Sequence, residues 1–395
     1  MPQRVTGRFE RTRVGGEEVA AFVPLPLPPG RPPLDLEGDR LALLRRAEQA
    51  LARLDLAGDL VPSIDWFVYA FVRKEAVLSA QIEGTQATLV DLLHFEAQAE
   101  PSDSAPSADV EEVCNSLDAL AFARAQLADP RGLPLSMRLL NETHARLMRG
   151  ARGADKHPGE VRRSQNWIGG TRPGNARYVP PPPHALGEAL GALEAYLNAE
   201  DGLPALVRAG LLHVQFESIH PYLDGNGRIG RLLVTLLLER WGLLSRPLLY
   251  LSLHLKRHRA EYFRRLDAVR AEGDWEGWLD FFLEAVATTA DEAVATARDL
   301  FALVAADRAR VLALPGASLG AVRLLELLPR SPIVRVGSVV RLLDTTKPTA
   351  SRAVEALVEA GVLVETSGRK RDRTFVYAGY LDRLRGGTEL GPPAP

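Results

Sequence analysis

The sequence predicts a mainly α-helical protein that carries a small β-hairpin within its helical body and ends in a winged helix-turn-helix of mixed α and β structure. Three observations support this fold class. Apolar residues recur at helical spacing over most of the chain. A Gly- and Pro-rich stretch, residues 159–183, interrupts the helices, and from residue 317 onward short helices give way to short strands.

The composition is that of a soluble globular protein. Its 395 residues suffice for two or three domains, each with an ordinary hydrophobic core. Lys and Arg total 48 and Asp and Glu total 50, so the chain as a whole has no field that would attract nucleic acid or an anionic membrane. Hydrophobic residues make up 46% and charged residues 25%, which excludes a disordered or collagen-like chain.

Three features predict a cytoplasmic protein without a membrane partner. Cys114 is the only cysteine, so an internal disulfide or a Cys-based metal site is excluded, which suits a reducing compartment. The first 16 residues lack the apolar segment of a signal peptide. The most apolar stretch, Leu232–Leu238, is far shorter than the roughly 18 residues of a membrane span.

The elements are expected in the following order. Residues 8–23 alternate like a strand or hairpin around Gly15-Gly16, and a Pro-rich connector follows at 24–33. Residues 100–108, rich in Pro, Ser and Asp, indicate a loop. Helices are expected within 39–93 (two or three), at 110–127, 136–148, 185–199 and 204–218, and again after residues 227, 254 and 275.

The interruption at 159–183 is typical of a β-hairpin. Gly169-Gly170 and Pro173-Gly174-Asn175 are turn formers, and short apolar segments at 166–168 and 177–179 flank them.

The C-terminal pattern predicts the winged helix-turn-helix. Segment 317–385 holds 12 Lys or Arg against 7 Asp or Glu, a net charge of +5. Its expected elements are helices at 322–328, 336–343 and 348–360, followed by strands at 362–365 and 374–377.

The segment HPYLDGNGRIGR, residues 220–231, lies between two expected helices. Asp224-Gly225 and Asn226-Gly227 are consecutive turn dipeptides, so their backbone N–H groups can converge on one point. Such a nest at a helix N-terminus binds anions. Arg228 and Arg231 are three residues apart, hence on one helical face, where two guanidinium groups can hold a polyphosphate.

Two further residues of this segment offer reactive groups. Asp224 provides a hard oxygen ligand for Mg2+, and His220 provides a base near neutral pH. The alternative is a structural loop with salt-bridging arginines. A calcium loop is excluded because its sixth and twelfth positions, counted from Asp224, are Ile229 and Thr235. A Walker loop is excluded because GK[ST] does not occur.

HPYLDGNGRIGR resembles HPFx[DE]GNGRxxR, the motif of the Fic family of AMP transferases. Tyr222 in place of Phe is the single departure, and its hydroxyl needs a partner. The approach HVQFESIH (213–220) and the run GEVRRSQNWIGG (159–170) also resemble the family. The resemblance implies a Fic-fold catalytic core at 110–300, with its Fido domain at about 134–286, between an N-terminal segment (1–109) and the winged helix (317–385).

The resemblance also implies roles for single residues. His220 would take the proton from a Ser, Thr or Tyr hydroxyl of a target protein, the hydroxyl would attack ATP, and Asp224 would hold Mg2+. The protein substrate would lie as an added strand along the flap, residues 167–179. Core packing is the alternative for Tyr262. The residues expected to bind nucleotide are Ile168, Gly169, Gly170, Thr171, Gly225, Asn226, Gly227, Arg228, Gly230, Arg231 and Tyr262.

An upstream segment, Ser79 to Gly84, resembles the family's inhibitory motif, [ST]xxxE[GN]. Glu83, paired with Arg231, would occupy a guanidinium that otherwise binds nucleotide phosphates. The alternative is a helix end capped by Gly84, with Glu83 merely solvated. Related proteins with this glutamate also remove AMP, and the sequence does not decide whether Glu83 does so.

Other functions and partners stay open at this stage. The runner-up is a DNA-binding regulator whose Fic core senses nucleotide, and a third hypothesis is transfer of a different phosphoryl group. Dimerisation or protein docking is the alternative use of the winged helix, and self-modification and a homodimer also fit. Phosphate contact is favoured by polar and basic residues at the start of the third helix and in the wing: Thr345, Thr346, Lys347, Thr349, Ser351, Arg352, Arg369, Lys370, Arg371 and Arg373.

Overall fold

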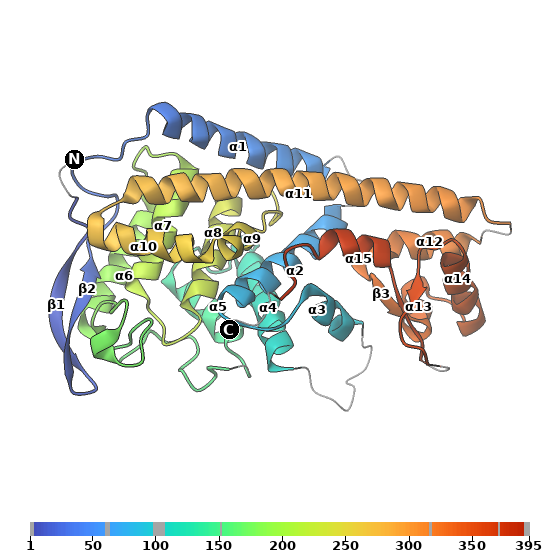
Figure 1. The fold of residues 1–395 in the computed structure, drawn as a ribbon, viewed down its shortest axis with the longest axis horizontal. Coiled ribbons are helices and arrows are strands. Elements are labelled where there is room, and N and C mark those ends of the chain that lie inside the picture. Colours follow the sequence, from blue (N-terminus) through green and yellow to red (C-terminus); the bar gives the residue numbers. More distant parts are fainter. Residues whose placement is uncertain are drawn as a thin grey trace.

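The computed structural model describes residues 4–59, 64–97, 107–150, 152–315, 318–369 and 372–390. Most of the expected loop at 100–108 and two residues of the wing, Lys370 and Arg371, lie outside these ranges. Within them the protein is mainly helical with two small antiparallel sheets, so the predicted fold class is confirmed (Figure 1).

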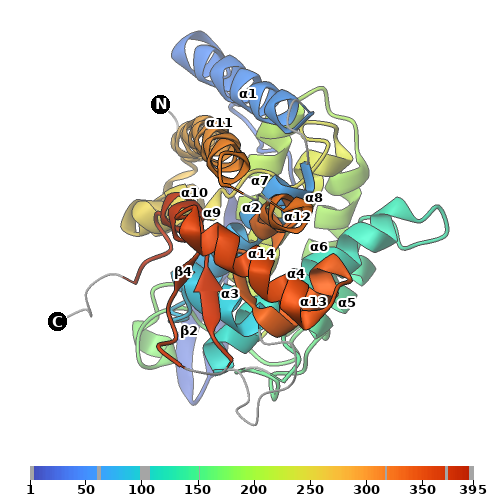
Figure 2. The same cartoon turned by 90° about the vertical axis from the view of Figure 1, so that its right-hand side faces the viewer.

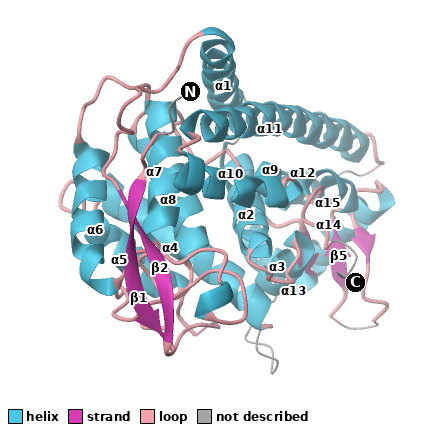
Figure 3. Ribbon diagram, turned by 60° about the vertical axis from the view of Figure 1, so that its left-hand side comes forward, coloured by secondary structure: helices cyan, strands magenta, loops and turns pink. Residues whose placement is uncertain are grey.

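A β-hairpin opens the described chain, as predicted. Strand β1 (Gly7–Val14) pairs with β2 (Glu17–Pro24) in antiparallel register. The turn between them uses Gly15 and Gly16, whose φ angles of 57° and 87° disfavour any side chain. The hairpin stands at one end of the molecule, beside α6 (Figure 3).

Helices form the body where the apolar spacing predicts them. Ser107, Ser136 and Asp274 cap the starts of three of them with side-chain oxygens, which satisfies backbone N–H groups that have no helical partner. The region after residue 254, expected as one helix, is two. The helices of the body are α1 (Gly38–Asp59), α2 (Ile64–Ile82), α3 (Leu89–Glu96), α4 (Ala108–Ala128), α5 (Met137–Leu147), α6 (Pro183–Asn198), α7 (Ala205–Ile219), α8 (Asn226–Arg240), α9 (Ser252–Arg257), α10 (Arg259–Glu272) and α11 (Trp275–Leu312).

Helix α7 is the centre of the body. Every residue from Leu206 to Ile219 is buried, because α6, α8, α10, α11 and β2 surround the helix. A helix covered on all sides cannot shift easily, since its neighbours are close-packed. It therefore gives a fixed starting point to the loop 220–225 and to α8, which packs beside it.

Helix α11 connects the body to the C-terminal module. It runs along nearly the whole molecule, with α1 beside it in the body and α12 and α15 beside its far end (Figure 1). It continues unbroken through residue 300, where the sequence led us to expect the end of the catalytic core. One helix thus serves both parts of the chain.

The C-terminal module has the predicted order of helices and strands (Figure 2). Strand β5 lies between β3 and β4 in an antiparallel sheet. The sequence did not predict β3 or α15, because three residues and seven residues give too short a pattern to detect. The elements are α12 (Leu319–Leu327), a 3-10 turn (Leu328–Arg330), β3 (Ile333–Arg335), α13 (Val336–Leu343), α14 (Lys347–Glu359), β4 (Val364–Glu365), β5 (Thr374–Val376) and α15 (Ala378–Leu384).

The hairpin expected at 159–183 forms only in part. Ile168 and Tyr178 make a single bridge, in which the Ile168 N–H donates to the Tyr178 carbonyl at 2.8 Å. The side chain of Asn175, rather than a ladder of hydrogen bonds between strands, holds the turn together. Its Oδ1 accepts the N–H groups of Thr171 and Arg172, each at 3.0 Å. The flap is therefore a loop with a 3-10 turn (Pro173–Asn175), held by side-chain hydrogen bonds, rather than two strands.

Strand β2 braces the flap from the other side. The Phe22 N–H donates to the Val179 carbonyl at 2.9 Å, and Glu17 accepts from the Arg172 guanidinium at 2.8 Å and the Gly174 N–H at 2.6 Å.

Across the described residues, none of the helices combines the length and hydrophobicity needed to cross a bilayer.

Candidate functional site

His220 ends α7 in an unusual backbone conformation. Its φ of 50° and ψ of 62° lie in the left-handed region, which few residues other than glycine adopt. Arg162 holds it there by donating from Nε to the His220 carbonyl at 2.9 Å, and the Arg162 N–H donates to the Pro221 carbonyl at the same distance. Arg162 belongs to the segment 159–170 that resembles the family, but the sequence alone predicted no role for it.

The neighbouring carbonyls at the end of α7 also have side-chain donors. The Tyr178 hydroxyl donates to the Ser218 carbonyl at 2.6 Å, and Arg270 Nη2 donates to the Glu217 carbonyl at 3.3 Å. A helix end leaves such carbonyls without helical partners. Tyr178 belongs to the flap and Arg270 to α10, so both elements set the position of the turn that carries His220.

The imidazole of His220 is neutral at physiological pH. Burial, with the positive charges of Arg270 and Arg162 nearby, lowers the pKa of His220 to about 3. A neutral imidazole is the form that accepts a proton. An anion bound beside it would raise this pKa and make the ring a stronger base.

The loop after His220 is held by Asn226. Its Oδ1 accepts the Tyr222 N–H at 2.9 Å, and its Nδ2 donates to the Tyr222 carbonyl at 2.8 Å. The Tyr222 hydroxyl, the one departure from the family motif, donates to Asn141 Oδ1 at 2.8 Å. The departure is thus accommodated inside the core by a partner on α5 that sequence reasoning missed.

Gly225 begins α8 with a positive φ of 75°. A Cβ at this position would lie 2.9 Å from Met148 Sδ, so glycine is needed for space as well as for conformation. Gly225 has no side chain that could cap the helix, which leaves the first turn of α8 open to an anion.

A carboxylate already lies at that turn. Glu83 Oε1 accepts from Arg231 Nη2 at 2.7 Å, and a Cβ on Gly227 would overlap the same oxygen. The Arg231 side chain is only 1% exposed, and it also donates from Nε to Ser79 Oγ and from Nη2 to the Ser79 carbonyl, each at 2.9 Å. Burial opposes the charge on Arg231, but the Glu83 carboxylate raises its pKa overall. Glu83 therefore occupies an anion position favoured by the helix dipole and a buried guanidinium.

The turn that carries Glu83 is also a glycine-capped helix end. Helix α2 stops at Ile82, and Gly84 has a φ of 97° with open space around its Cα. The N–H groups of Glu83 and Thr85 donate to the Ala80 carbonyl at 3.0 and 3.2 Å. The glycine-capped helix end is thus present, but Glu83 is paired with Arg231 rather than merely solvated, and inhibition by Glu83 stays a prediction.

Arg228 is buried against α4. Its Nη1 lies 3.8 Å from Glu112 Oε2 and its Nη2 lies 3.4 Å from Met148 Sδ. Among the described residues, Arg228 Nε and Nη1 have no hydrogen-bond partner. Unpaired buried donors of a cation are costly, so this guanidinium is suited to an incoming anion.

Two expected nucleotide contacts lie in the core instead. Tyr262 is 1% exposed, and its hydroxyl bonds His213 Nε2 at 2.8 Å. A Cβ on Gly230 would overlap the Glu217 carboxylate, so this glycine lets α7 and α8 approach. The packing favours the structural alternative for Tyr262, and a nucleotide contact by either residue stays a prediction.

Asp224 suits the predicted magnesium ion. Its carboxylate is half exposed, and Oδ1 accepts the Gly225 N–H at 2.6 Å. No group of three or more His, Cys, Asp or Glu side chains able to hold a metal occurs among the residues that the structure describes. Mg2+ in phosphate sites commonly takes one or two carboxylates and completes its shell with phosphate oxygens and water, so a single hard ligand fits.

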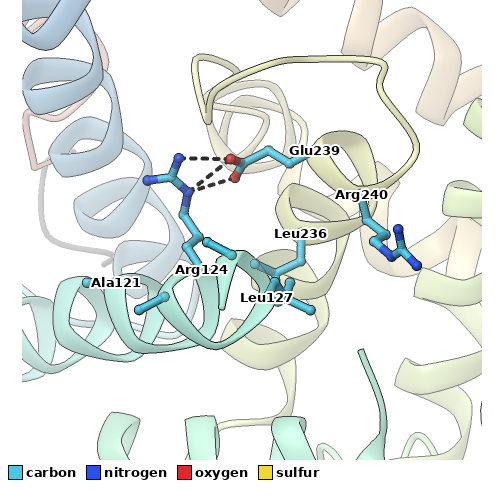
Figure 4. Close-up of a pocket in the computed structure, with 8 residues that line it drawn as sticks. Ala121, Arg124, Leu127, Leu236, Glu239 and Arg240 are labelled. Atoms are coloured by element: carbon cyan, nitrogen blue, oxygen red, sulfur yellow. Dashed lines mark hydrogen bonds and ion pairs between the residues drawn. The ribbon is translucent and has the colours of Figure 1, made fainter. Parts of the chain in front are cut away.

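A cavity of about 620 Å3 lies at the opposite end of α8 (Figure 4). It is formed with α4, and Arg124 pairs with Glu239 across it at 2.9 Å. Glu239 is 13 residues beyond Asn226, or about 20 Å along the helix. The cavity is therefore separate from the motif.

Comparison with known proteins bears on this arrangement. The model of the Fic/DOC family N-terminal region matches residues 41–125, and that of the Fic/DOC family matches residues 134–238. Proteins called protein adenylyltransferase Fic match over 135 residues, 34% of this chain. Those of Culex quinquefasciatus and Drosophila grimshawi are 36% and 34% identical there. The match spans 24% and 25% of those two relatives' own length.

Solved structures resemble a larger share of the chain. A Fic family protein from Desulfovibrio desulfuricans has a TM-score of 0.56 at 19% identity, over 88% of this chain and 98% of its own. A Fic domain containing signaling protein from Bacteroides thetaiotaomicron has a TM-score of 0.51 at 19% identity, over 64% of this chain and 97% of its own. At these identities the likeness concerns the fold.

Proposed function

Because this chain belongs to the Fic/DOC family, we propose that it is a protein adenylyltransferase that moves AMP from ATP to Ser, Thr or Tyr hydroxyls of target proteins. The observation that carries the proposal is the turn at the start of α8. There a neutral His220 precedes a glycine-opened helix N-terminus, beside two buried arginines suited to anions.

In the proposed reaction His220 accepts the proton of the target hydroxyl. The oxygen forms a bond to the α-phosphorus of ATP, the bond from that phosphorus to the bridging oxygen breaks, and pyrophosphate leaves with the electron pair. The first-turn N–H groups of α8 bind phosphate oxygens, and Arg228 holds the outer phosphates. Asp224 would hold Mg2+, which neutralises phosphate charge when it is bound. Positioning and charge stabilisation supply most of the rate enhancement in such a site.

Autoinhibition by Glu83 is part of the proposal. Glu83 accepts from Arg231 and lies on the first turn of α8, where phosphate oxygens would otherwise bind. ATP can then bind only in an unproductive pose. Removal of AMP with Glu83 as a water-orienting base is a further proposed activity of the same carboxylate.

The flap and the C-terminal module are the proposed contacts for partners. The flap between Trp167 and Val179 leaves the edge of Ile168–Thr171 exposed or half-exposed, which suits a substrate strand. The module's order of three helices and a small sheet supports a winged helix, with Lys347 and Arg352 exposed on α14. DNA or protein contact through it stays a proposal, as does a cytoplasmic location.

The test of the activity compares two labels on ATP. We expect Glu83→Gly protein incubated with lysate and Mg2+ to transfer label from α-labelled ATP to protein, and none from γ-labelled ATP, because pyrophosphate leaves. Mass spectrometry should then find AMP on a hydroxyl residue. Retained γ-label without α-label would refute adenylylation in favour of another phosphoryl transfer.

A further inference from the structure

His144, on α5, joins the two halves of the proposed active site. Its Nδ1 accepts the Gly159 N–H at 2.8 Å, so the ring proton is on Nε2, which lies 3.0 Å from the Asp224 carbonyl and donates to it. The ring also stacks on Tyr222, with centroids 3.8 Å apart and planes 6° from parallel. One buried side chain thus contacts the motif loop at two residues.

The two hydrogen bonds of His144 reach different reacting groups. The bond to Asp224 fixes the peptide that connects the proposed metal ligand to the nest at Gly225. The bond to Gly159 anchors the segment that reaches Arg162 three residues later, and Arg162 holds the carbonyl of His220. Displacement of this ring would loosen both the metal ligand and the base.

The two hydrogen bonds define the form of His144. The ring is 1% exposed, and it can accept at Nδ1 and donate from Nε2 at the same time only when it is neutral. No donor or acceptor of the ring is left for a substrate, so His144 acts through the groups that it holds.

We propose that His144 is a positioning residue for adenylyl transfer, which holds Asp224 and the nest at Gly225 in the geometry that binds the metal–nucleotide complex. This inference rests on the proposed function. It predicts a loss of metal–nucleotide affinity beyond any loss of stability.

The test replaces His144 with Phe, which keeps a ring on Tyr222 but removes both hydrogen bonds. The matched control is Asn141→Ala, one turn earlier on α5, which removes the Tyr222 hydroxyl partner and leaves Asp224 untouched. Both changes are made in Glu83→Gly protein. Calorimetry measures the affinity for α,β-methylene ATP with Mn2+, which binds without being transferred, and thermal unfolding measures stability.

We expect His144→Phe to weaken binding about tenfold while Asn141→Ala changes it less than twofold, although both lower the melting temperature. Equal affinities in the two variants would overturn the positioning role and leave the proposed function standing. Absence of binding by the Glu83→Gly parent would overturn both.

A second, independent observation concerns the C-terminal segment, residues 386–390, which docks on the turn that carries Glu83. Gln81 Nε2 donates to the Thr388 carbonyl and to the Ala87 carbonyl, both at 2.8 Å. Thr388 is 1% exposed. Gln81 therefore bridges the turn around Glu83 and attaches it to residues more than 300 positions away in the chain.

Lys256, on α9, completes this attachment. Its Nζ donates to Gln81 Oε1 at 2.7 Å, to the Gly387 carbonyl at 2.8 Å and to the Glu389 carbonyl at 3.0 Å. The segment follows directly after α15, which packs on α11 within the C-terminal module. A change in the module is thereby connected to the inhibitory turn through main-chain bonds.

We infer that residues 386–390 latch the Glu83 turn in its inhibitory position, so that release of this segment raises AMP transfer. The inference rests on the proposed function and on inhibition by Glu83. The latch acts only through Glu83, because none of its bonds reaches the motif loop itself.

The test is Lys256→Met in the full chain, with Arg264→Met as control, since the exposed Arg264 pairs with Glu261 on its own helix, α10. We expect Lys256→Met to raise labelling from α-labelled ATP about threefold to tenfold, to speed amide exchange at residues 83–87, and to change nothing in Glu83→Gly protein. A folded Lys256→Met protein with unchanged exchange, or a gain that persists without Glu83, would overturn the latch. Absence of labelling by Glu83→Gly would instead refute the proposed function.

Discussion

Replacing Glu83 with Gly should raise AMP transfer by about tenfold or more. The change removes the carboxylate from Arg231 and from the first turn of α8, and so frees a buried guanidinium for phosphate oxygens. Hydrogen bonds to charged groups contribute about 1.5–3 kcal/mol, and each 1.4 kcal/mol is a factor of ten. The Glu83 side chain is 39% exposed, so solvent screening places the effect near the lower end of that range.

The measurement is the initial rate of labelling from α-labelled ATP in lysate, compared at equal protein concentration. Glu83→Gln separates charge from size and should give an intermediate rate, because its amide oxygen still accepts from Arg231. Glu200→Gly makes the same replacement at an exposed loop position between α6 and α7, away from the Glu83 turn, and it should match the unaltered protein. Equal rates for Glu83→Gly and the unaltered protein would rule out inhibition by this residue.

Replacing His220 with Ala should lower AMP transfer by a factor of about 10²–10⁴, the usual contribution of general base catalysis. The imidazole is neutral, and Arg162 holds its backbone beside the nest, so it is prepared to accept the proton of an attacking hydroxyl. Nucleotide affinity should change little, because the phosphates are expected to bind the N–H groups and arginines of α8.

Single-turnover labelling in the Glu83→Gly background measures this loss, and calorimetry with a non-transferable ATP analogue measures affinity. His184→Ala is the matched control, since His184 is an exposed residue whose ring contacts Glu10 in the N-terminal hairpin. A His220→Ala protein that keeps its rate within a factor of ten would exclude His220 as the base.

The sequence predicted the helical body, the N-terminal hairpin and the order of the C-terminal module, because long amphipathic segments and paired glycines act locally. It was less successful at the flap, where turn residues suggested two strands. There local bonds to the Asn175 side chain and long-range bonds from Glu17 on β2 replace the strand ladder, and side-chain bonds of either kind leave no periodic signal in the sequence. The sequence also did not predict β3 and α15, which have only three and seven residues.

In the candidate site, too, some residues could be predicted from the sequence and others could not. The motif at 220–231 and the pairing of Glu83 with Arg231 could be expected from residue types and resemblance. The supporting residues could not, since Asn141, His144 and Arg162 act on main-chain atoms or on Tyr222 from other elements. Tyr262 is the reverse case: the family resemblance suggested a nucleotide contact, whereas the ring lies in the core, and the contact stays a prediction.

By itself the sequence determined the chemistry available to this protein: a base, a carboxylate, two arginines and a glycine-opened helix start within twelve residues. Only the tertiary structure decided which groups face one another. It placed the Glu83 carboxylate beside the first turn of α8, turned Arg228 toward Glu112, and attached the turn that carries Glu83 to Thr388. The physical reason is that propensity and spacing act within a few residues, whereas burial and hydrogen bonds between distant segments depend on how the helices pack.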